Sequence, residues 1–381
     1  MKQIALLGST GSIGKSTIEV IKHMKNDFSV FALAANTDFA TLAKQIIDFR
    51  PKIVVIGENQ NKDALYKLVK TKAKHLTILF GETGLINIAV NNNTDILVMA
   101  MSGTMGLIPL LKAIEKRKKI ALSTKELLVG FGKIIMAQAK KYKTEIVPID
   151  SELVGVHQCL DGKNISQIKK VILTASGGPF FRRKNLTNIS IEQALNHPVW
   201  KMGKKITIDS STLANKGLEV IETSRMFSIP PDKINVLIHP QSIIHAMVEF
   251  NDNTILASLS KPDMRSCIQY ALTYPNRLPS LIHPLNLAEQ NKLEFYRPDL
   301  EKFKALKIAY QAAKLDGTAP CIFNAANEVA VNNFIKGKIK FNMIPIIIEK
   351  VMYTLPHIKN PDLRALIQCE QTTMKFTEAI I

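Results

Sequence analysis

The sequence predicts an α/β fold: an N-terminal Rossmann-like, doubly wound domain, a central mixed α/β catalytic domain, and a C-terminal helical bundle. Three observations predict it. Short apolar runs alternate with helical patterns at the start, strand-like runs dominate the middle, and helical periodicity dominates the end. A chain of 381 residues is also too long for one ordinary core. We therefore expect domains at 1–149, 150–275 and 299–381, with a linker at 276–298.

The first domain begins with Ile4–Leu7, which reads as a buried strand, followed by a glycine-rich turn and the helical pattern Ser16–Met24. A second helical pattern covers Leu42–Phe49. Such alternation of strands and helices is typical of a parallel sheet covered on both faces. The further strands expected are Phe28–Ala34, Ile53–Ile56, Ile96–Ala100, Ile120–Leu122 and Glu145–Ile149.

The regular alternation of strands and helices ends after residue 150. From there strand-like runs predominate, and helices are expected at Leu213–Phe227 and Arg265–Thr273. The segment Pro275–Pro298 is rich in Pro and Asn and reads as a crossover linker. The expected strands are Lys170–Thr174, Lys205–Asp209, Ile234–Ile238, Ser242–Phe250 and Thr254–Leu259. The expected C-terminal helices are Leu300–Lys314, Cys321–Lys336 and Met343–Leu355.

The composition argues against several classes of protein. The formal charge of +18 comes mostly from scattered lysines, and aromatics are only 6% of residues, so we expect no nucleic-acid partner. No apolar run reaches the roughly 18 residues that span a bilayer, so we expect no membrane association. The four cysteines form no C-x-x-C pair, and no signal peptide precedes the first strand. We expect a protein of the reducing cytoplasm.

A glycine-rich turn, Gly8–Gly14, follows the first strand and opens the first helix with the spacing G-x-x-G-x-x-G. Glycines allow a pyrophosphate to approach the backbone, and the helix N-terminus supplies N–H donors. We expect dinucleotide binding, with contacts from Thr10, Gly11, Ser12 and Ile13; the alternative is a plain tight turn. Asn36-Thr37-Asp38 after the second strand leaves the choice between NAD and NADP open.

Two further segments suit a metal and a phosphate. Asp150 and Glu152 are two apart, so in an extended segment both carboxylates point the same way. Asn215 and Glu219 are four apart, so on a helix they share a face, with Lys216 beside them. Three carboxylates suit a hard divalent cation, and a lysine, asparagine and serine suit a phosphate.

Three loops carry additional candidates. Ser176 lies in a serine-glycine-glycine loop that could close on an anion, or could be an ordinary turn. The segment His197–Gly203 holds the only tryptophan, which could be a core anchor or part of a lid. His239 follows a predicted strand, and a catalytic and a structural role have comparable weight.

The whole chain resembles the 1-deoxy-D-xylulose 5-phosphate reductoisomerases of the non-mevalonate isoprenoid pathway. No single motif is decisive, but the ordered set is highly specific. The motifs are GSTGSIG (8–14), KE (125–126), PIDSE (148–152), LTASGGPF (173–180), HPVWKMG (197–203), DSSTLANKGLE (209–219), IHPQSIIH (238–245), KPDMR (261–265) and FNAANEVAV (323–331).

The resemblance implies a homodimer that binds NADPH and Mg²⁺ or Mn²⁺, possibly Co²⁺, and acts on a small phosphorylated sugar. Its metal ligands would be Asp150, Glu152 and Glu219, and its phosphate contacts Ser176, Ser210, Asn215 and Lys216, with His197 nearby. Ser151 would contact a substrate hydroxyl, Trp200 and Met202 would cover the substrate from a flap at 196–204, and His239 would line the site. Cofactor contacts would include Asn36, Thr124, Lys125, Glu126 and Gly203.

The implied reaction converts 1-deoxy-D-xylulose 5-phosphate to 2-C-methyl-D-erythritol 4-phosphate by retro-aldol and aldol steps followed by hydride transfer. The metal would act as a Lewis acid on the substrate's ketone and neighbouring hydroxyl. The phosphate grip would anchor the remote end of the substrate and support flap closure.

Three departures from the family pattern concern Leu153 where His is usual, Thr124 where Asn is usual, and Asn36-Thr37-Asp38 after the second strand. The last concerns the strength of the preference for NADPH over NADH. Two alternatives stand beside this interpretation. A semialdehyde or homoserine dehydrogenase would need a catalytic Cys or Lys in place of the three carboxylates, and a non-catalytic nucleotide-binding protein would have lost them.

Overall fold

The computed structural model describes residues 1–57, 62–69 and 76–381. Within it the chain forms two compact units. The first comprises residues 1–127, 135–154 and 263–283; the second comprises 128–134, 155–262 and 284–381.

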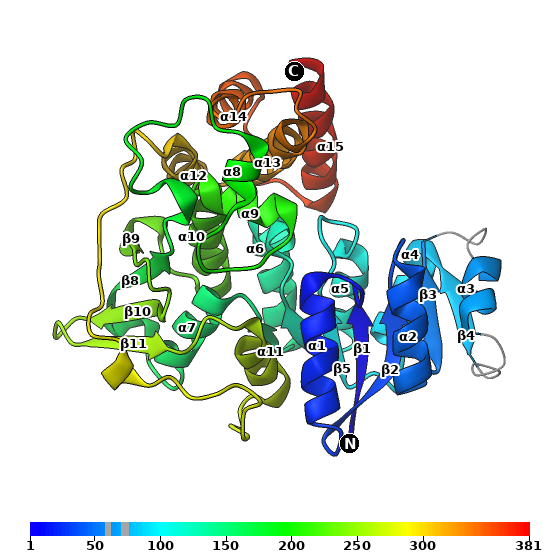
Figure 1. Cartoon of the computed structure of the whole chain (residues 1–381). Helices are drawn as coiled ribbons and strands as arrows, with labels where there is room; N and C mark the ends of the chain where they lie inside the picture. Colours follow the sequence, from blue (N-terminus) through cyan, green and yellow to red (C-terminus); the bar gives the residue numbers. More distant parts are fainter. Residues whose placement is uncertain (58–61, 70–75) are drawn as a thin grey trace. The chain divides into compact units, whose positions relative to one another are not determined.

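The first unit is built on a seven-stranded sheet in the order β4-β3-β2-β1-β5-β6-β7, and all its strand pairs are parallel. Figure 1 shows this sheet with α1 and α2 beside it. The strand order runs outward in both directions from β1, which is the doubly wound arrangement predicted. The strands are β1 (Lys2–Leu7), β2 (Phe28–Ala34), β3 (Ile53–Ile56), β4 (Thr77–Phe80), β5 (Ile96–Met99), β6 (Lys119–Leu122) and β7 (Ile146–Pro148).

The helices of the first unit bury one apolar face each against this sheet. In α1, Val20 and Ile21 are buried and join the core that contains Ile4 and Leu6 of β1. Burying each such side chain contributes about 1.5–3 kcal/mol. The helices are α1 (Ser12–His23), α2 (Phe39–Phe49), α3 (Lys62–Val69), α4 (Gly81–Val90), α5 (Leu107–Glu115), α6 (Lys125–Tyr142), α7 (Ser151–Leu160) and α11 (Met264–Thr273), of which α6 and α7 continue into the second unit.

The turn between β1 and α1 depends on glycine at two positions. Gly8 has φ +88°, and a Cβ there would lie 2.3 Å from the carbonyl oxygen of Ala100. A Cβ on Gly14 would lie 2.2 Å from the carbonyl oxygen of Gly8. Side chains at these positions would push the helix away from the strand, so both glycines hold the N-terminus of α1 against the end of β1.

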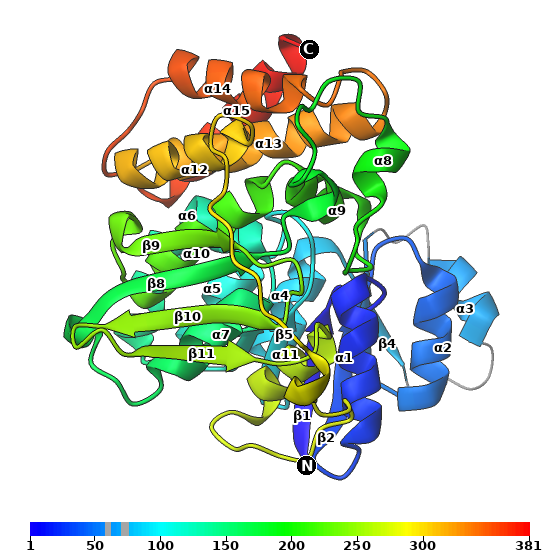
Figure 2. The same ribbon diagram turned by 60° about the vertical axis from the view of Figure 1, so that its left-hand side comes forward.

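The second unit contains a four-stranded mixed sheet in the order β11-β10-β8-β9. The β8–β9 pair is parallel and the other two pairs are antiparallel. Figure 2 shows these strands side by side. They are β8 (Ile168–Ala175), β9 (Ile234–Ile238), β10 (Ile244–Phe250) and β11 (Ile255–Leu259). The chain between β8 and β9 forms three helices, α8 (Ile191–Leu195), α9 (Lys204–Ser211) and α10 (Ala214–Phe227).

The helices at the end of the chain form their own layer of the second unit. Their core includes Phe323, Ile322 and Ile348, and it extends to Leu218 on α10. This core therefore fixes α10 against the terminal helices, which are α12 (Lys304–Leu315), α13 (Ala319–Ile335), α14 (Met343–Thr354) and α15 (Leu363–Ala379). The sequence prediction of the fold class is confirmed, although it did not include α15.

One predicted strand is wrong. Residues 205–209 belong to helix α9. The β-branched run Ile206-Thr207-Ile208 favours a strand by propensity, but an ion pair between Lys205 and Asp209, 2.9 Å apart, links successive helical turns. This pair and the tertiary hydrogen bond that Asp209 accepts from Asn327 at 2.8 Å override the local preference.

In the part of the chain that the structure describes, no helix combines the length and apolar character required to cross a membrane.

Candidate active site

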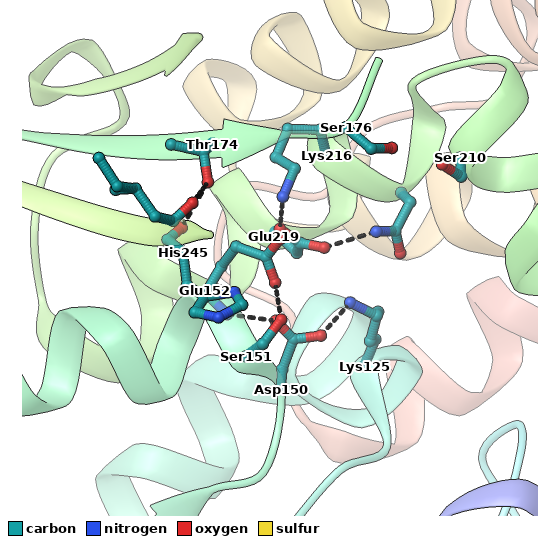
Figure 3. A network of polar contacts seen from close by, with 12 residues as sticks. Lys125, Asp150, Ser151, Glu152, Thr174, Ser176, Ser210, Lys216, Glu219 and His245 are labelled. Atoms are coloured by element: carbon teal, nitrogen blue, oxygen red, sulfur yellow. Dashed lines mark hydrogen bonds and ion pairs between the residues drawn. The ribbon is translucent and has the colours of Figure 1, made fainter. Parts of the chain in front are cut away.

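The first unit contributes two carboxylates at the point where β7 passes into α7. Asp150 precedes the helix, and its carboxylate accepts from the backbone N–H of Glu152 at 3.3 Å. Lys125, buried at the start of α6, donates to Asp150, as Figure 3 shows. Ser151 donates to Glu152 at 2.5 Å. The start of α7 therefore places two carboxylates, the donor set of a hard divalent cation, next to each other.

The geometry that brings Asp150 and Glu152 together differs from the prediction of an extended segment. Residues 151–160 are helical, so strand alternation cannot align the two side chains. Asp150 instead lies in the position that caps the helix, and Glu152 lies in its first turn. Carboxylate oxygens of the two still come within 4.8 Å of each other. The helix start therefore gathers the pair.

The second unit contributes Glu219 on α10, where the predicted shared face is confirmed. Glu219 is only 1% exposed, and it accepts from Asn215 at 2.5 Å and from Lys216. Both donors lie three or four residues earlier on the same helix. An isolated buried carboxylate would be costly, so this cluster keeps Glu219 ionised inside the protein.

A second polar cluster of this unit joins three residues from three segments. Nε2 of His197 lies 2.9 Å from the Ser176 hydroxyl and 3.1 Å from the Ser210 hydroxyl. Ser176 follows β8, and its hydroxyl also accepts from the backbone N–H of Gly178 at 3.1 Å. Gly177 and Gly178 both have positive φ, so the loop can turn sharply here. Two hydroxyls and a ring N–H converge in the manner that an anion requires.

The protonation state of His197 follows from its contacts. Its Nδ1 accepts from the backbone N–H groups of Val199 and Trp200, at 3.2 and 2.9 Å. Nδ1 is therefore unprotonated, and the proton of the neutral ring is on Nε2, which faces the two serines. Burial lowers the pKa of His197 from 6.5 to about 4. The ring is a neutral donor near pH 7.

This lowered pKa predicts a pH dependence of stability. The unfolded chain takes up a proton at His197 near its ordinary pKa, whereas the folded chain takes it up only near pH 4. Between these values the unfolded state binds more protons, so the free energy of unfolding falls as pH falls. We expect the unfolding temperature to drop more steeply from pH 6.5 to 4 in the wild type than in His197→Asn. Parallel curves for the two proteins would contradict the buried, neutral ring.

The segment that follows His197 is a loop, as predicted, and carries Trp200 and Met202, both half-buried. The ring of Trp200 lies 6.4 Å from the ring of His245. His245 is buried on β10, and its Nε2 lies 2.9 Å from the Ser260 hydroxyl. His245 ends the motif IHPQSIIH, but nothing in its sequence context predicts a role for its side chain; only the fold brings it to Trp200.

His239 lies at the end of β9, as predicted, but its surroundings tie it to the linker at 276–298. Its Nδ1 donates to the carbonyl of Glu294 at 2.9 Å, and its ring stacks on Phe295 at 4.9 Å. Burial lowers the pKa of His239. The described residues give its buried Nε2 no hydrogen-bond partner. These contacts suit a histidine that orders the linker, and the catalytic role stays a prediction.

A cavity of about 360 Å³ opens in the first unit beside the glycine-rich turn. It is lined by Gly8, Thr10 and Gly11, and by the segments that end β2, β3 and β5. The carboxyl ends of parallel strands are where open α/β sheets bind ligands. The predicted contacts Ser12 and Ile13 begin α1 next to it. The cavity fits a dinucleotide phosphate at the N-terminus of that helix.

The residues after β2 separate into two roles. Asn36 and Thr37 line this cavity. Asp38 instead caps α2, since its carboxylate accepts from the backbone N–H of Thr41 at 3.0 Å. The hydrogen bonds from Thr41 lower the pKa of Asp38. Its carboxylate is therefore engaged away from the position where NAD enzymes bind the ribose 2′-OH with an acidic side chain.

Thr124, Lys125 and Glu126 lie at the start of α6. Thr124 is buried and donates to the carbonyl of Met101 at 2.7 Å, and Met101 lines the cavity. Gly203 begins α9 in the second unit. Leu153, where the family usually has His, is 1% exposed, so this chain keeps an apolar side chain there without loss of a carboxylate.

A parallel sheet with a glycine turn, a cavity at its strand ends, and separate carboxylate and hydroxyl clusters define a dinucleotide-dependent oxidoreductase. The chain also matches three sequence models of one family. These are 1-deoxy-D-xylulose 5-phosphate reductoisomerase at residues 4–132, its C-terminal domain at 146–227, and the DXP reductoisomerase C-terminal domain at 259–376.

Relatives and solved structures agree. The chain is 46% identical to the 1-deoxy-D-xylulose 5-phosphate reductoisomerase of Protochlamydia amoebophila, over 92% of this chain and 91% of that protein. It is 45% identical to that of Lachnospira eligens over the full length of both. A crystal structure of DOX-P reductoisomerase with NADPH, fosmidomycin and magnesium matches with a TM-score of 0.93 at 37% identity, covering 100% of this chain and 98% of that one. The enzyme from Zymomonas mobilis with NADPH matches with a TM-score of 0.91 at 34% identity, with the same coverage.

The chain therefore belongs to the 1-deoxy-D-xylulose 5-phosphate reductoisomerase family, as the motif resemblance predicted. A dehydrogenase of the homoserine or semialdehyde type is not supported.

Proposed function

We propose that this protein converts 1-deoxy-D-xylulose 5-phosphate to 2-C-methyl-D-erythritol 4-phosphate with NADPH and a divalent cation. Family membership supports the reaction. The observation that carries the site assignment is the Ser176–His197–Ser210 cluster, which combines anion donors with a neutral histidine. It explains why the chain would bind a phosphorylated substrate.

The proposed metal ligands are Asp150, Glu152 and Glu219, which offer one carboxylate oxygen each. Their donor chemistry fits Mg²⁺ or Mn²⁺, with Co²⁺ also compatible. A bound divalent cation would supply Lewis-acid polarisation of the substrate's ketone and hydroxyl oxygens. The chain's own contribution is to orient these carboxylates, through the contact of Lys125 with Asp150 and through those of Lys216 and Asn215 with Glu219.

Different residues are proposed to bind the two ends of the substrate. Ser176, Ser210, Asn215 and Lys216 would bind the phosphate, with the Nε2–H of His197 donating beside them. An ammonium has three N–H donors, so the contact of Lys216 with Glu219 is compatible with a second contact to phosphate. Ser151, whose hydroxyl donates to Glu152, would accept from a substrate hydroxyl. Binding of the phosphate end would orient the reacting carbons of the substrate toward the proposed metal ligands.

The loop at 196–204 is proposed to cover the substrate. Trp200 and Met202 would present an apolar surface to it, and the backbone contacts on His197 Nδ1 fix the start of this loop. Exclusion of water would protect a reactive enolate and aldehyde. His239 would order the adjoining linker segment through Glu294.

NADPH is proposed to bind in the first unit, where it would supply the hydride. Thr10, Gly11, Ser12 and Ile13 would contact its pyrophosphate, and Asn36 its adenosine ribose, because these residues line or adjoin the cavity. The proposed nicotinamide-side contacts are Thr124, Lys125, Glu126 and Gly203. Asp38 caps α2 and is therefore not proposed as a ribose contact.

The remaining proposals concern organisation. We propose a cytoplasmic homodimer, since all four cysteines are free thiols and the edge strand β11 exposes Ile255 and Leu256 by 49% and 40%. Edge strands with exposed apolar side chains are surfaces that a second copy can cover. The domain boundaries at 149, 275 and 298, with the linker before the terminal helices, also stay proposals.

The test of the site assignment uses fosmidomycin, the ligand named with a reductoisomerase structure of this fold. We expect it to inhibit turnover competitively with the phosphorylated substrate, and a chelator to abolish both turnover and inhibition. Ser210→Ala should weaken this inhibition about tenfold or more, because one donor to a charged group contributes about 1.5–3 kcal/mol. Unchanged inhibition of Ser210→Ala would move the phosphate site elsewhere.

A further inference from the structure

Helix α9 links the loop that carries His197 to a buried carboxylate with no assigned role. Asp209 is 1% exposed and immediately precedes Ser210. Lys205, one turn earlier, lies 2.9 Å from one carboxylate oxygen, and the side-chain amide of Asn327 on α13 donates to the other at 2.8 Å. The C-terminal helical layer thus reaches the helix that holds a proposed phosphate contact.

The burial of Asp209 is unfavourable by itself. A carboxylate near the C-terminal end of a helix opposes the helix dipole, and burial adds a desolvation cost. Replacing a buried ion pair with apolar side chains is often neutral for stability, so stability alone does not explain it. The contacts of Asp209 with Lys205 and Asn327 instead hold α9 in a single orientation.

That orientation matters for the cluster of Ser176, His197 and Ser210. Ser210 follows Asp209 directly and contacts the ring of His197 at 3.1 Å. The neighbouring Ser211 donates to the carbonyl of Ala194 at 2.6 Å, which fixes the helix that precedes the loop. The start of the 196–203 loop is therefore attached to the last turn of α9, through Ser211 to Ala194 and through Ser210 to His197, and Asn327 attaches that turn to α13.

We propose that Asp209 and Asn327 are positioning residues that hold Ser210 and His197 in the geometry required to bind the substrate phosphate. This inference rests on the proposed function of those two residues. Asn327 is fully buried, and its Oδ1 has no hydrogen-bond partner among the described residues, so its amide is oriented by Asp209. The pair acts through Ser210 and does not itself touch substrate.

The test compares Asn327→Asp with Asn333→Asp. In Asn327→Asp two carboxylates face each other across the Asp209 contact. Asn333 lies on the same helix, is equally buried, and donates to the carboxylate of Glu378 at 2.7 Å, so its substitution also places two carboxylates opposite each other away from the cluster, although Glu378 is 51% exposed and the repulsion there is weaker. The readouts are the KM for the phosphorylated substrate, kcat, the Ki of inorganic phosphate as a competitor, and the Kd of NADPH.

We expect Asn327→Asp to raise the KM and the phosphate Ki at least about tenfold, with NADPH binding unchanged, and Asn333→Asp to change neither by more than about twofold. The exchanged pair Asp209→Asn with Asn327→Asp restores a donor opposite an acceptor and should recover most of the loss. Equal effects of Asn327→Asp and Asn333→Asp, or no effect of Asn327→Asp, would overturn the proposal.

A second variant covers the case in which Asn327→Asp does not fold. Asp209→Asn keeps an acceptor for Asn327 and removes only the charge, and we expect the phosphate Ki to rise at least about threefold. An unchanged Ki would overturn the proposal. Ser210→Ala separates this inference from the site assignment. If Ser210→Ala leaves the Ki unchanged, the assignment itself fails; if it raises the Ki and the Asp209 and Asn327 variants do not, only the positioning role fails.

Discussion

Glu219→Gln is expected to lower kcat at least about 10²-fold, because removing one preorganised electrostatic contact to a transition state typically costs that much. Gln keeps the size of the side chain but only one of the two oxygens that accept from Asn215 and Lys216, and it loses the charge that a divalent cation needs. The residual rate should need a much higher metal concentration. NADPH binding, followed by nicotinamide fluorescence, should be unchanged.

Glu222→Gln is the matched control for this variant. Glu222 lies one turn further along the same helix and is 2% exposed, so its substitution also neutralises a buried carboxylate. We expect it to retain the wild-type dependence on metal concentration. Normal turnover by Glu219→Gln would remove Glu219 from the metal site. The same rise in the required metal concentration in Glu222→Gln would also remove it.

Lys216→Ala is expected to raise the KM for the phosphorylated substrate about 10- to 150-fold. A hydrogen bond to a charged group contributes about 1.5–3 kcal/mol, and each 1.4 kcal/mol is about tenfold. Lys216 also contacts Glu219, so a smaller rise in the metal concentration at half-maximal rate should accompany the change. Steady-state kinetics at saturating NADPH measure both quantities.

Lys170→Met provides the comparison for lost positive charge in the same unit. Lys170 pairs with Glu249 at 2.8 Å and has no place in the proposed site. The KM of Lys170→Met for the phosphorylated substrate should stay at the wild-type value. An unchanged KM in Lys216→Ala would assign the phosphate to other residues, whereas equal increases in both variants would indicate a general effect of net charge on an anionic substrate.

The sequence predicted the repeating parts of the fold because local chemistry determines them. Apolar runs at Ile4–Leu7 and Phe28–Ala34 are buried on both faces of a parallel sheet, and only a strand accommodates them there. The shared face of Asn215 and Glu219 follows from helical periodicity alone. Residues 205–209 could not be predicted in this way, since the helix there depends on Asn327, which is 118 residues away from Asp209.

The same distinction holds for the site. The motifs predicted which residues take part, but the reasons for their proximity are tertiary. Asp150 and Glu152 meet at a helix start and not along a strand, because β7 ends at Pro148. The neutral state of His197 depends on burial and on two backbone donors within its own loop. The role of Asp38 as a helix cap also became apparent only from its contact with Thr41.

The most direct test of the proposed function is NADPH oxidation, followed by nicotinamide absorbance, with 1-deoxy-D-xylulose 5-phosphate and Mg²⁺ or Mn²⁺. Parallel reactions would contain a chelator or NADH in place of NADPH. The account predicts oxidation that requires both the sugar phosphate and the metal, with NADPH preferred over NADH. No oxidation by folded protein that binds NADPH, or oxidation that persists in the chelator, would contradict it.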